Sequence, residues 1–135
     1  MAYAGSVSFS PALGLSGPIG GRRYLVTIAE TEGAATSEAQ INWLRKVNLR
    51  LLRADLTETS GTATTYHPRV GPATAPDGYN GGVLVKAAAT APPISVEGAL
   101  GSVLATSDAG LLYWRSTPDA GADNVTTVKL WFEVL

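Results

Sequence analysis

The chain contains a single histidine, His67, between Tyr66 and Pro68 at the end of an expected strand. One histidine excludes a metal site with two histidine ligands, and a Ser-His-Asp triad would have to use this residue. Such a triad also needs a nucleophile on a strained turn, and the sequence contains no G-x-S-x-G motif. We therefore interpret His67 as a structural or exposed residue and expect no enzyme activity. A hydrolase that uses His67 is the alternative.

Three oxygen donors, Asp119, Asp123 and Asn124, occur in one loop, and such donors bind hard cations such as calcium. The spacing differs from that of an EF-hand, which supplies more ligands within its loop. Asp and Asn are also frequent in turns, because their side chains bond to nearby backbone and tolerate left-handed conformations. We favour a turn, and expect neither a metal nor a cofactor.

Three further groups of residues have both a functional and a structural interpretation. Arg45, Lys46, Arg50 and Arg53 form the only basic cluster, which would mostly share a solvated face of a strand or contact an acidic partner surface. The glycine-rich segment GPIGGRR precedes a strand, so it lacks the helix N-terminus that binds phosphate. The three tryptophans, at positions 43, 114 and 131, could line a sugar-binding groove, but packing in a core or interface is the commoner use and the one we favour.

The composition restricts the class of protein. With 135 residues, the chain can form one domain with a substantial core, and without cysteine it has no disulfide framework. Ten basic and eleven acidic residues nearly balance, so we expect no binding to nucleic acid through a general electrostatic field. The N-terminal sequence lacks the basic region of a secretory signal, and no segment approaches the roughly 20 apolar residues of a membrane-spanning helix, so we expect no membrane contact.

We expect an extended N-terminal arm over residues 1–21 and a β-sandwich domain over residues 22–135. Five glycines and two prolines interrupt the arm, and a disordered terminus is one interpretation. Disordered segments are usually polar and charged, whereas this one carries apolar side chains. The apolar residues favour an arm that lies on its own sheet or on a neighbouring subunit.

The sandwich prediction depends on period-2 alternation of apolar residues. It places Tyr24, Val26 and Ile28 on one face of a strand over residues 22–30. For residues 38–46 helix and strand are both open, because Ser37 and Gln40 form a capping-box pattern. Strand is favoured for residues 47–57, where the alternation slips by one residue at Leu51–Leu52 and predicts a β-bulge.

The second half of the chain continues this pattern. We expect a hairpin over residues 57–67, a long surface loop over 68–82, and short strands at 83–86 and 102–106. A tight turn at 107–110 leads into the strand LLYWR, and a polar loop joins it to the last strand as a C-terminal hairpin. Leu112, Trp114, Leu130 and Phe132 are expected in the core, with Trp131 facing outward. Seven or eight strands result, the number of a sandwich.

Three segments in this order resemble small structural proteins of tailed bacteriophages: YLVTIAETEGAATSEAQI, LTETSGTATTYHPRVG and GLLYWRSTPDAGADN. The resemblance covers roughly residues 22–135. Within this class, the sequence resembles the capsid decoration proteins, also called cement proteins. It implies an all-β, jelly-roll-like antiparallel sandwich on the outer capsid surface of the virion, made in the host cytoplasm. It carries over no catalytic residues.

The expected function is therefore stabilisation of an assembled phage capsid by bridging neighbouring capsid subunits. The expected partners are the major capsid protein and further copies of the chain in a homotrimer. A phage tail or adhesin module that binds carbohydrate is the alternative function. The residues predicted to contact a partner come from the arm, the start of the domain and the last strand: Tyr3, Phe9, Leu13, Leu15, Ile19, Arg22, Arg23 and Trp131.

Overall fold

The computed structural model of the chain describes residues 4–10, 21–32, 37–60, 65–66, 69–71, 84–85, 94–95, 103–116 and 124–135. Every regular element within these ranges is a strand. Six strands are long: β1 (Ala4–Ser10), β2 (Arg23–Glu32), β3 (Ser37–Asn42), β4 (Asn48–Ser60), β10 (Leu111–Ser116) and β11 (Asn124–Val134). Five are short: β5 (Thr65–Tyr66), β6 (Arg69–Gly71), β7 (Leu84–Val85), β8 (Ile94–Ser95) and β9 (Val103–Ala105).

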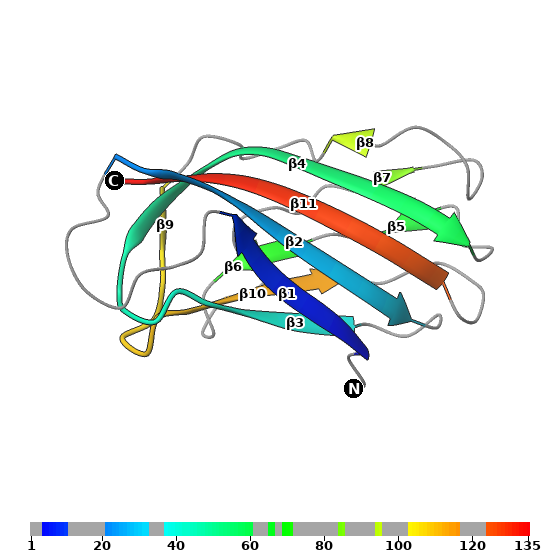
Figure 1. Cartoon of the computed structure of the whole chain (residues 1–135), viewed down its shortest axis with the longest axis horizontal. Coiled ribbons are helices and arrows are strands. Elements are labelled where there is room, and N and C mark those ends of the chain that lie inside the picture. Colours follow the sequence, from blue (N-terminus) through cyan, green and yellow to red (C-terminus); the bar gives the residue numbers. More distant parts are fainter. Residues whose placement is uncertain are drawn as a thin grey trace.

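The strands form two main layers (Figure 1). The larger sheet has the order β1-β2-β11-β4-β8, with β9 also paired to β4, and the smaller sheet has the order β3-β10-β6. A further pair joins β5 to β7. All of these pairings are antiparallel. The prediction of an all-β antiparallel sandwich is confirmed.

Strand β11 is the centre of the larger sheet, because β2 pairs with one of its edges and β4 with the other. The apolar residues that alternate along it are buried between the sheets: Val128, Leu130, Phe132 and Val134. Its neighbour β2 buries Tyr24, Val26 and Ile28 in the same layer, as the alternation predicts. Burial of an apolar side chain of this size contributes about 1.5–3 kcal/mol.

Trp43 connects the two layers. It follows β3 of the smaller sheet, and its buried ring makes edge-to-face contacts with three rings of the larger sheet. The ring centroids of Phe9 on β1, Tyr24 on β2 and Phe132 on β11 lie 5.1, 5.5 and 5.5 Å from that of Trp43. Such pairs add about 0.5–1.5 kcal/mol each beyond the burial of their area.

The predicted β-bulge at Leu51–Leu52 is confirmed. Trp131 of β11 pairs with Arg53 of β4, and the next residue, Phe132, pairs with Leu51, so that Leu52 is the extra residue. Leu51 faces the core and Leu52 faces solvent. The bulge therefore lets both halves of β4 bury their apolar residues despite the slip in the sequence pattern.

Residues 37–42 are strand, which decides between the two alternatives left open by the sequence. Ala39, Ile41 and Trp43 are buried, while Gln40 and Asn42 are exposed. The capping-box pattern of Ser37 and Gln40 therefore does not start a helix, because the period-2 burial of this segment completes the core. After a bend at residues 44–45 the chain enters β4, where strand was favoured.

The expected C-terminal hairpin is wrong. Strand β10 belongs to the smaller sheet and β11 to the larger, so the last two long strands face each other across the core instead of pairing. Both strands have an apolar face to bury, and opposite layers bury the two faces against each other. Of the hairpin expected over residues 57–67, residues 61–64 and 67 lie outside the described residues, and the described β5 pairs with β7. Of the expected loop 68–82, residues 69–71 form β6 and the rest lie outside the described residues.

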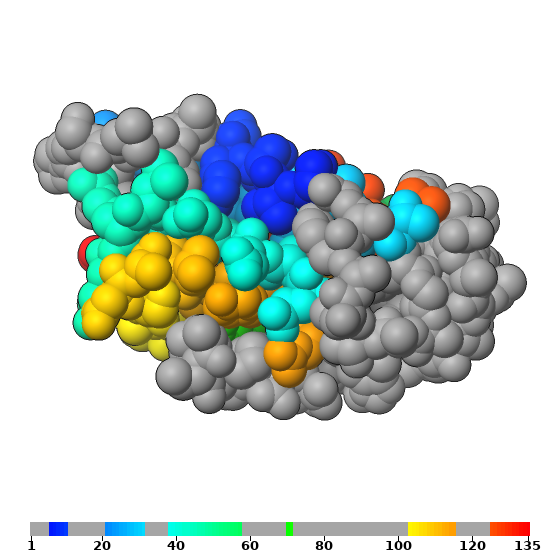
Figure 2. All heavy atoms as spheres, turned by 90° about the horizontal axis from the view of Figure 1, so that it is seen from below, coloured from blue at the N-terminus to red at the C-terminus, as the bar shows by residue number. Residues whose placement is uncertain are grey.

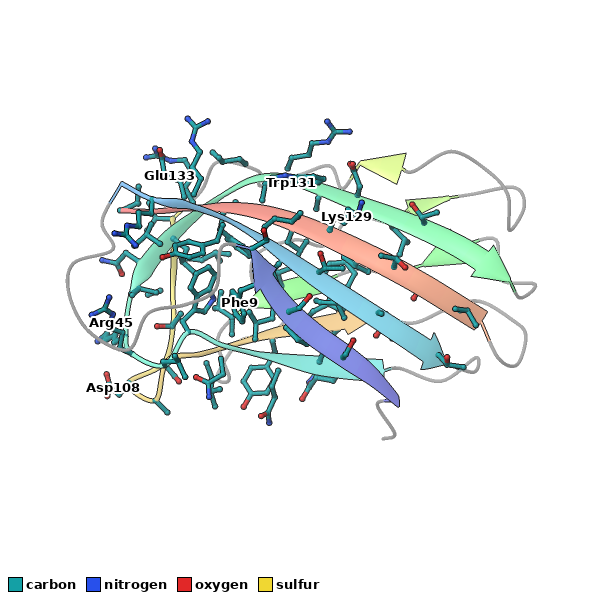
Figure 3. All side chains as sticks on the ribbon, viewed as in Figure 1. Phe9, Arg45, Asp108, Lys129, Trp131 and Glu133 are labelled. Atoms are coloured by element: carbon teal, nitrogen blue, oxygen red, sulfur yellow. The ribbon has the colours of Figure 1, made fainter. Side chains whose placement is uncertain are left out.

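The first part of the expected arm lies on its own sheet. Residues 4–10 form β1, which pairs with β2 along its length, from Ala4 opposite Thr31 to Ser10 opposite Leu25. Phe9 points between the sheets and, with Val7, packs against the core (Figure 3). Figure 2 shows β1 beside β3, the two strands that also contact each other at this side of the sandwich.

One end of the sandwich is formed by two linked turns, residues 43–47 and 106–110, which we call the tip. Trp43 N donates to Gly110 O at 2.7 Å, Thr106 N donates to Val47 O at 3.0 Å, and Val47 N donates to Thr106 Oγ1 at 2.8 Å. Gly110 N donates to Ser107 O at 2.8 Å, which confirms the tight turn expected at 107–110.

We expect any side chain at position 110 to destabilise this turn. Gly110 has a φ of +80°, and a Cβ placed on it would lie 2.6 Å from Arg45 N. Gly110→Ala should lower the free energy of unfolding by about 2–4 kcal/mol, through backbone strain and displacement of Arg45. Gly21→Ala is the matched control, because Gly21 has a φ of +81° with no atom near such a Cβ, and strain alone costs about 1–2 kcal/mol. Equal losses in urea unfolding would show that the tip is not closely packed.

The packing of β1 can be tested separately. Phe9→Ala removes a half-buried ring from Trp43 and should cost about 1–3 kcal/mol of unfolding free energy. Ser8→Ala changes an exposed residue on the same strand and should cost less than about 0.5 kcal/mol. If Phe9→Ala had no effect on urea unfolding of the full chain, β1 would not be part of the stable sheet.

Candidate partner-binding surface

The side of the larger sheet that faces away from the smaller one carries a cluster of charged side chains and one tryptophan. Figure 3 shows Lys129, Trp131 and Glu133 of β11 pointing to this side, opposite to Phe9. Strand alternation and register place residues of β2 and β4 beside them. We call this set the outer face: Arg23, Leu25, Arg50, Leu52, Arg53, Asp55, Lys129, Trp131 and Glu133.

Trp131 lies in the middle of the outer face and is held by a charged pair. It pairs with Leu25 on β2 and with Arg53 on β4. The Arg53 guanidinium lies over its ring, with Cζ 5.3 Å from the ring centroid. Asp55 fixes this guanidinium with both carboxylate oxygens, accepting from Arg53 Nε at 3.0 Å and lying 2.9 Å from Nη2. The ring therefore presents a preorganised aromatic contact rather than a freely rotating side chain.

A second charged group lies one step further along β11. Glu133 lies between two arginines, with Oε1 3.3 Å from Arg50 Nη1 and Oε2 3.8 Å from Arg23 Nε. These three residues come from adjacent strands in the order β2, β11 and β4, so they form a row across the sheet. The Glu133 carboxylate thus forms ion pairs with both guanidinium groups.

The structure brings together only some of the residues predicted to contact a partner. Arg23 and Trp131 lie on the outer face, and Arg22 is exposed where β2 begins. Phe9 is packed against the core instead of lying on a free surface. The remaining predicted contacts, Tyr3, Leu13, Leu15 and Ile19, lie outside the described residues, as do His67, Asp119 and Asp123.

The basic cluster and the tryptophans are both divided by the fold. Arg50 and Arg53 lie on the outer face, whereas Arg45 and Lys46 lie at the tip, as Figure 3 shows for Arg45. Trp43 and Trp114 are fully buried, which confirms that packing is their role and excludes a groove lined by all three tryptophans. Trp131 is the half-exposed member of the set.

Sequence reasoning missed five members of the outer face: Leu25, Leu52, Asp55, Lys129 and Glu133. All except Leu52, the bulge residue, have the parity of an outward residue in their strand, and that signal was available. Their assembly depends on pairing β2, β11 and β4, which lie up to about 100 residues apart in the chain, and no local pattern gives that register.

The tip also presents an exposed apolar side chain, that of Leu44. Leu44 has a φ of +67°, a conformation that is rare for leucine, and its amide donates to Asn42 Oδ1 at 2.8 Å. Its side chain is exposed, beside the ion pair of Lys46 Nζ with Asp108 Oδ1 at 3.2 Å. Positions of this kind persist only when surrounding contacts fix them, as the hydrogen bonds of the tip do here.

Within the described ranges, no group of three or more His, Cys, Asp or Glu side chains is placed to hold a metal ion. The same part of the chain contains no helix long and apolar enough to cross a membrane.

The contact between Arg53 and Trp131 can be measured by a double-mutant cycle. Arg53→Ala and Trp131→Leu, alone and together, should give a coupling free energy of about 0.5–1 kcal/mol in urea unfolding, the size of an exposed cation–π pair. Lys129→Ala with Trp131→Leu is the control, because Lys129 projects from the same face but makes no cation–π contact with the ring. Its coupling should stay below about 0.3 kcal/mol. Equal coupling in the two cycles would mean that Arg53 does not hold the ring.

Comparison with known proteins identified no relative of this chain. No protein-family model matches the chain, and no match was found among curated proteins or among solved structures. What the chain binds has to be inferred from its own residues and from the resemblance noted in its sequence.

Proposed function

We propose that this chain is a structural virion protein that binds the assembled capsid of a tailed phage and stabilises it by bridging neighbouring capsid subunits. The observation that supports this function best is the outer face of the larger sheet, where Trp131 is held by Arg53 and pairs with Leu25. The sequence resemblance to decoration proteins supplies the identity of the partner, the location on the outer capsid surface and the absence of catalysis.

The outer face has the composition of a protein contact. Tryptophan and arginine are enriched among the residues that dominate binding energy at protein interfaces. Trp131 lies on the central strand of the sheet, so little conformational freedom is lost when a partner covers it. A sheet face whose side chains are held in place by the core beneath suits the broad surface of a capsid.

Bridging requires a second contact surface on the same molecule. Residues 4–10 do not supply it as a free arm, because they form β1 on their own sheet. The tip supplies it in this proposal, since it holds the exposed Leu44 rigidly at one end of the sandwich. A trimer of chains on the capsid would multiply these contacts.

A carbohydrate-binding tail or adhesin module has weaker support. Its motivation is the three tryptophans together with the loop of Asp119, Asp123 and Asn124. Two of the tryptophans are buried, and Asp119 and Asp123 lie outside the described residues. The guanidinium of Arg53 already lies over the ring of the third, Trp131, where a sugar would stack.

Capsid binding predicts a specific thermal effect. Because the protein would bind assembled shells and not separated subunits, it should raise the melting temperature of expanded capsids of the phage that encodes it. The measurement is calorimetry of these capsids with and without the purified protein. If intact protein neither binds expanded shells nor raises their melting temperature, the proposed function is wrong.

The location of the contact has its own test. Trp131→Ala should weaken shell binding roughly 30-fold, the effect of a central interface residue worth about 2 kcal/mol. Gln40→Ala, an exposed change on the smaller sheet, is the control and should leave affinity within about twofold. Urea unfolding of both variants separates loss of binding from loss of stability. Equal affinities of the two variants would place the contact elsewhere.

A further inference from the structure

We infer that the outer face recognises an acidic protein surface, and that Arg23, Arg50, Arg53 and Lys129 make the charged contacts around Trp131. This inference names the chemistry of the partner; it rests on the proposed function only for the identity of that partner. Three observations on the described side chains support it.

The first observation is that the charges of the outer face lie in two layers. The cations stand outward, with side-chain exposures of 74% for Arg23, 62% for Arg53 and 42% for Arg50. The carboxylates that pair with them lie beneath, at 24% for Glu133 and 11% for Asp55. A molecule that approaches this face therefore meets guanidinium groups before it meets carboxylates.

The second observation is an excess of cations. Four cations and two carboxylates give the outer face a formal charge of +2, although the whole chain carries −1. Glu133 is shared between Arg23 and Arg50, and Lys129 is exposed with no ion pair to any described residue. Arg23 Nε lies 3.8 Å from Oε2 of its partner Glu133, so the N–H donors of Arg23 remain available to a second carboxylate.

The third observation is the contrast with the opposite side of the sandwich. There Glu38 and Arg115 form a one-to-one pair, with Arg115 Nε donating to Glu38 Oε2 at 2.9 Å. The other described side chains on that face, including Gln40, Asn42 and Tyr113, are uncharged. Among the side chains that the structure describes, the charges of that face therefore balance, whereas those of the outer face do not.

The geometry favours protein carboxylates over nucleic acid phosphates. Guanidinium forks bind carboxylates with two parallel hydrogen bonds, and single Asp or Glu side chains can enter between the arginines of a row. A continuous phosphate backbone would have to run across Glu133 and Asp55, whereas separate carboxylates can contact the guanidinium groups without doing so. Arg53 already lies over the Trp131 ring, which leaves less of the ring for a base to stack on.

Charges at the border of an interface act mainly on the association rate and on its dependence on salt. The association rate with expanded shells should fall about tenfold or more between 20 and 300 mM salt. Arg23→Gln combined with Lys129→Gln should lower that rate at 20 mM salt by about fivefold, and the difference should vanish at high salt.

Arg115→Gln is the control for the charge variants. It removes one cation that has a carboxylate partner, Glu38, but Arg115 lies on the outer side of the smaller sheet, away from both the outer face and the tip. Its effect on the association rate should be less than about 1.5-fold if the charge of the outer face matters and total charge does not.

A second arm is independent of capsids. Poly-L-glutamate, and single-stranded DNA of equal charge, are titrated into the full chain at 20 mM salt while the Trp131 indole N–H is followed by NMR. Poly-L-glutamate should shift this resonance, the Arg23→Gln, Lys129→Gln variant should lose most of the shift, and DNA should bind more weakly. Stronger binding of DNA would overturn the inference in favour of nucleic acid.

The two arms also separate this inference from the proposed function. If the protein bound poly-L-glutamate but not shells, the result would support recognition of an acidic surface and contradict the proposed capsid function. Shell binding that is insensitive to salt and to the charge variants, with no shift by poly-L-glutamate, would support the capsid and overturn the acidic partner.

Discussion

The contact on which the rest of the structure depends is the burial of Trp43 between the two sheets. Its ring meets Phe9, Tyr24 and Phe132 on three strands of the larger sheet, while its backbone amide is bonded to Gly110 at the tip. These contacts fix which residues of the three strands face inward. Because side chains alternate along a strand, they also fix that Arg23, Leu25, Trp131 and Glu133 face outward.

The outer face follows from that constraint. The bulge at Leu52 keeps Leu51 in the core and turns Arg53 toward Trp131. Asp55, two residues on, then reaches the same guanidinium. Core packing and the proposed contact surface are thus opposite sides of the same three strands, and a rigid core keeps the surface side chains in place. In the proposed function this rigidity lowers the entropic cost of binding to the capsid.

Much of the fold could be predicted from local alternation. Tyr24, Val26 and Ile28 in one strand, Leu130 and Phe132 in another, and the slip at Leu51–Leu52 each carry a local signal that the structure confirms. Alternation alone does not decide the strand over 37–42, because the capping-box pattern of Ser37 and Gln40 favours a helix there. The sheet assignment of β10 and β11 was wrong because two successive apolar strands can either pair or face each other, and the sequence between them does not decide which. The outer face could not be assembled from sequence, because it needs the register of strands that are distant in the chain.

The most direct test is hydroxyl-radical footprinting of the protein bound to expanded capsids, compared with the free protein. Trp131 and Tyr113 are both half-exposed aromatic side chains, and they lie on the outer sides of opposite sheets. If the outer face of the larger sheet contacts the capsid, oxidation of Trp131 should fall severalfold on binding while oxidation of Tyr113 changes little. Protection of Tyr113 with Trp131 left reactive, or protection of neither residue at saturating binding, would contradict this assignment.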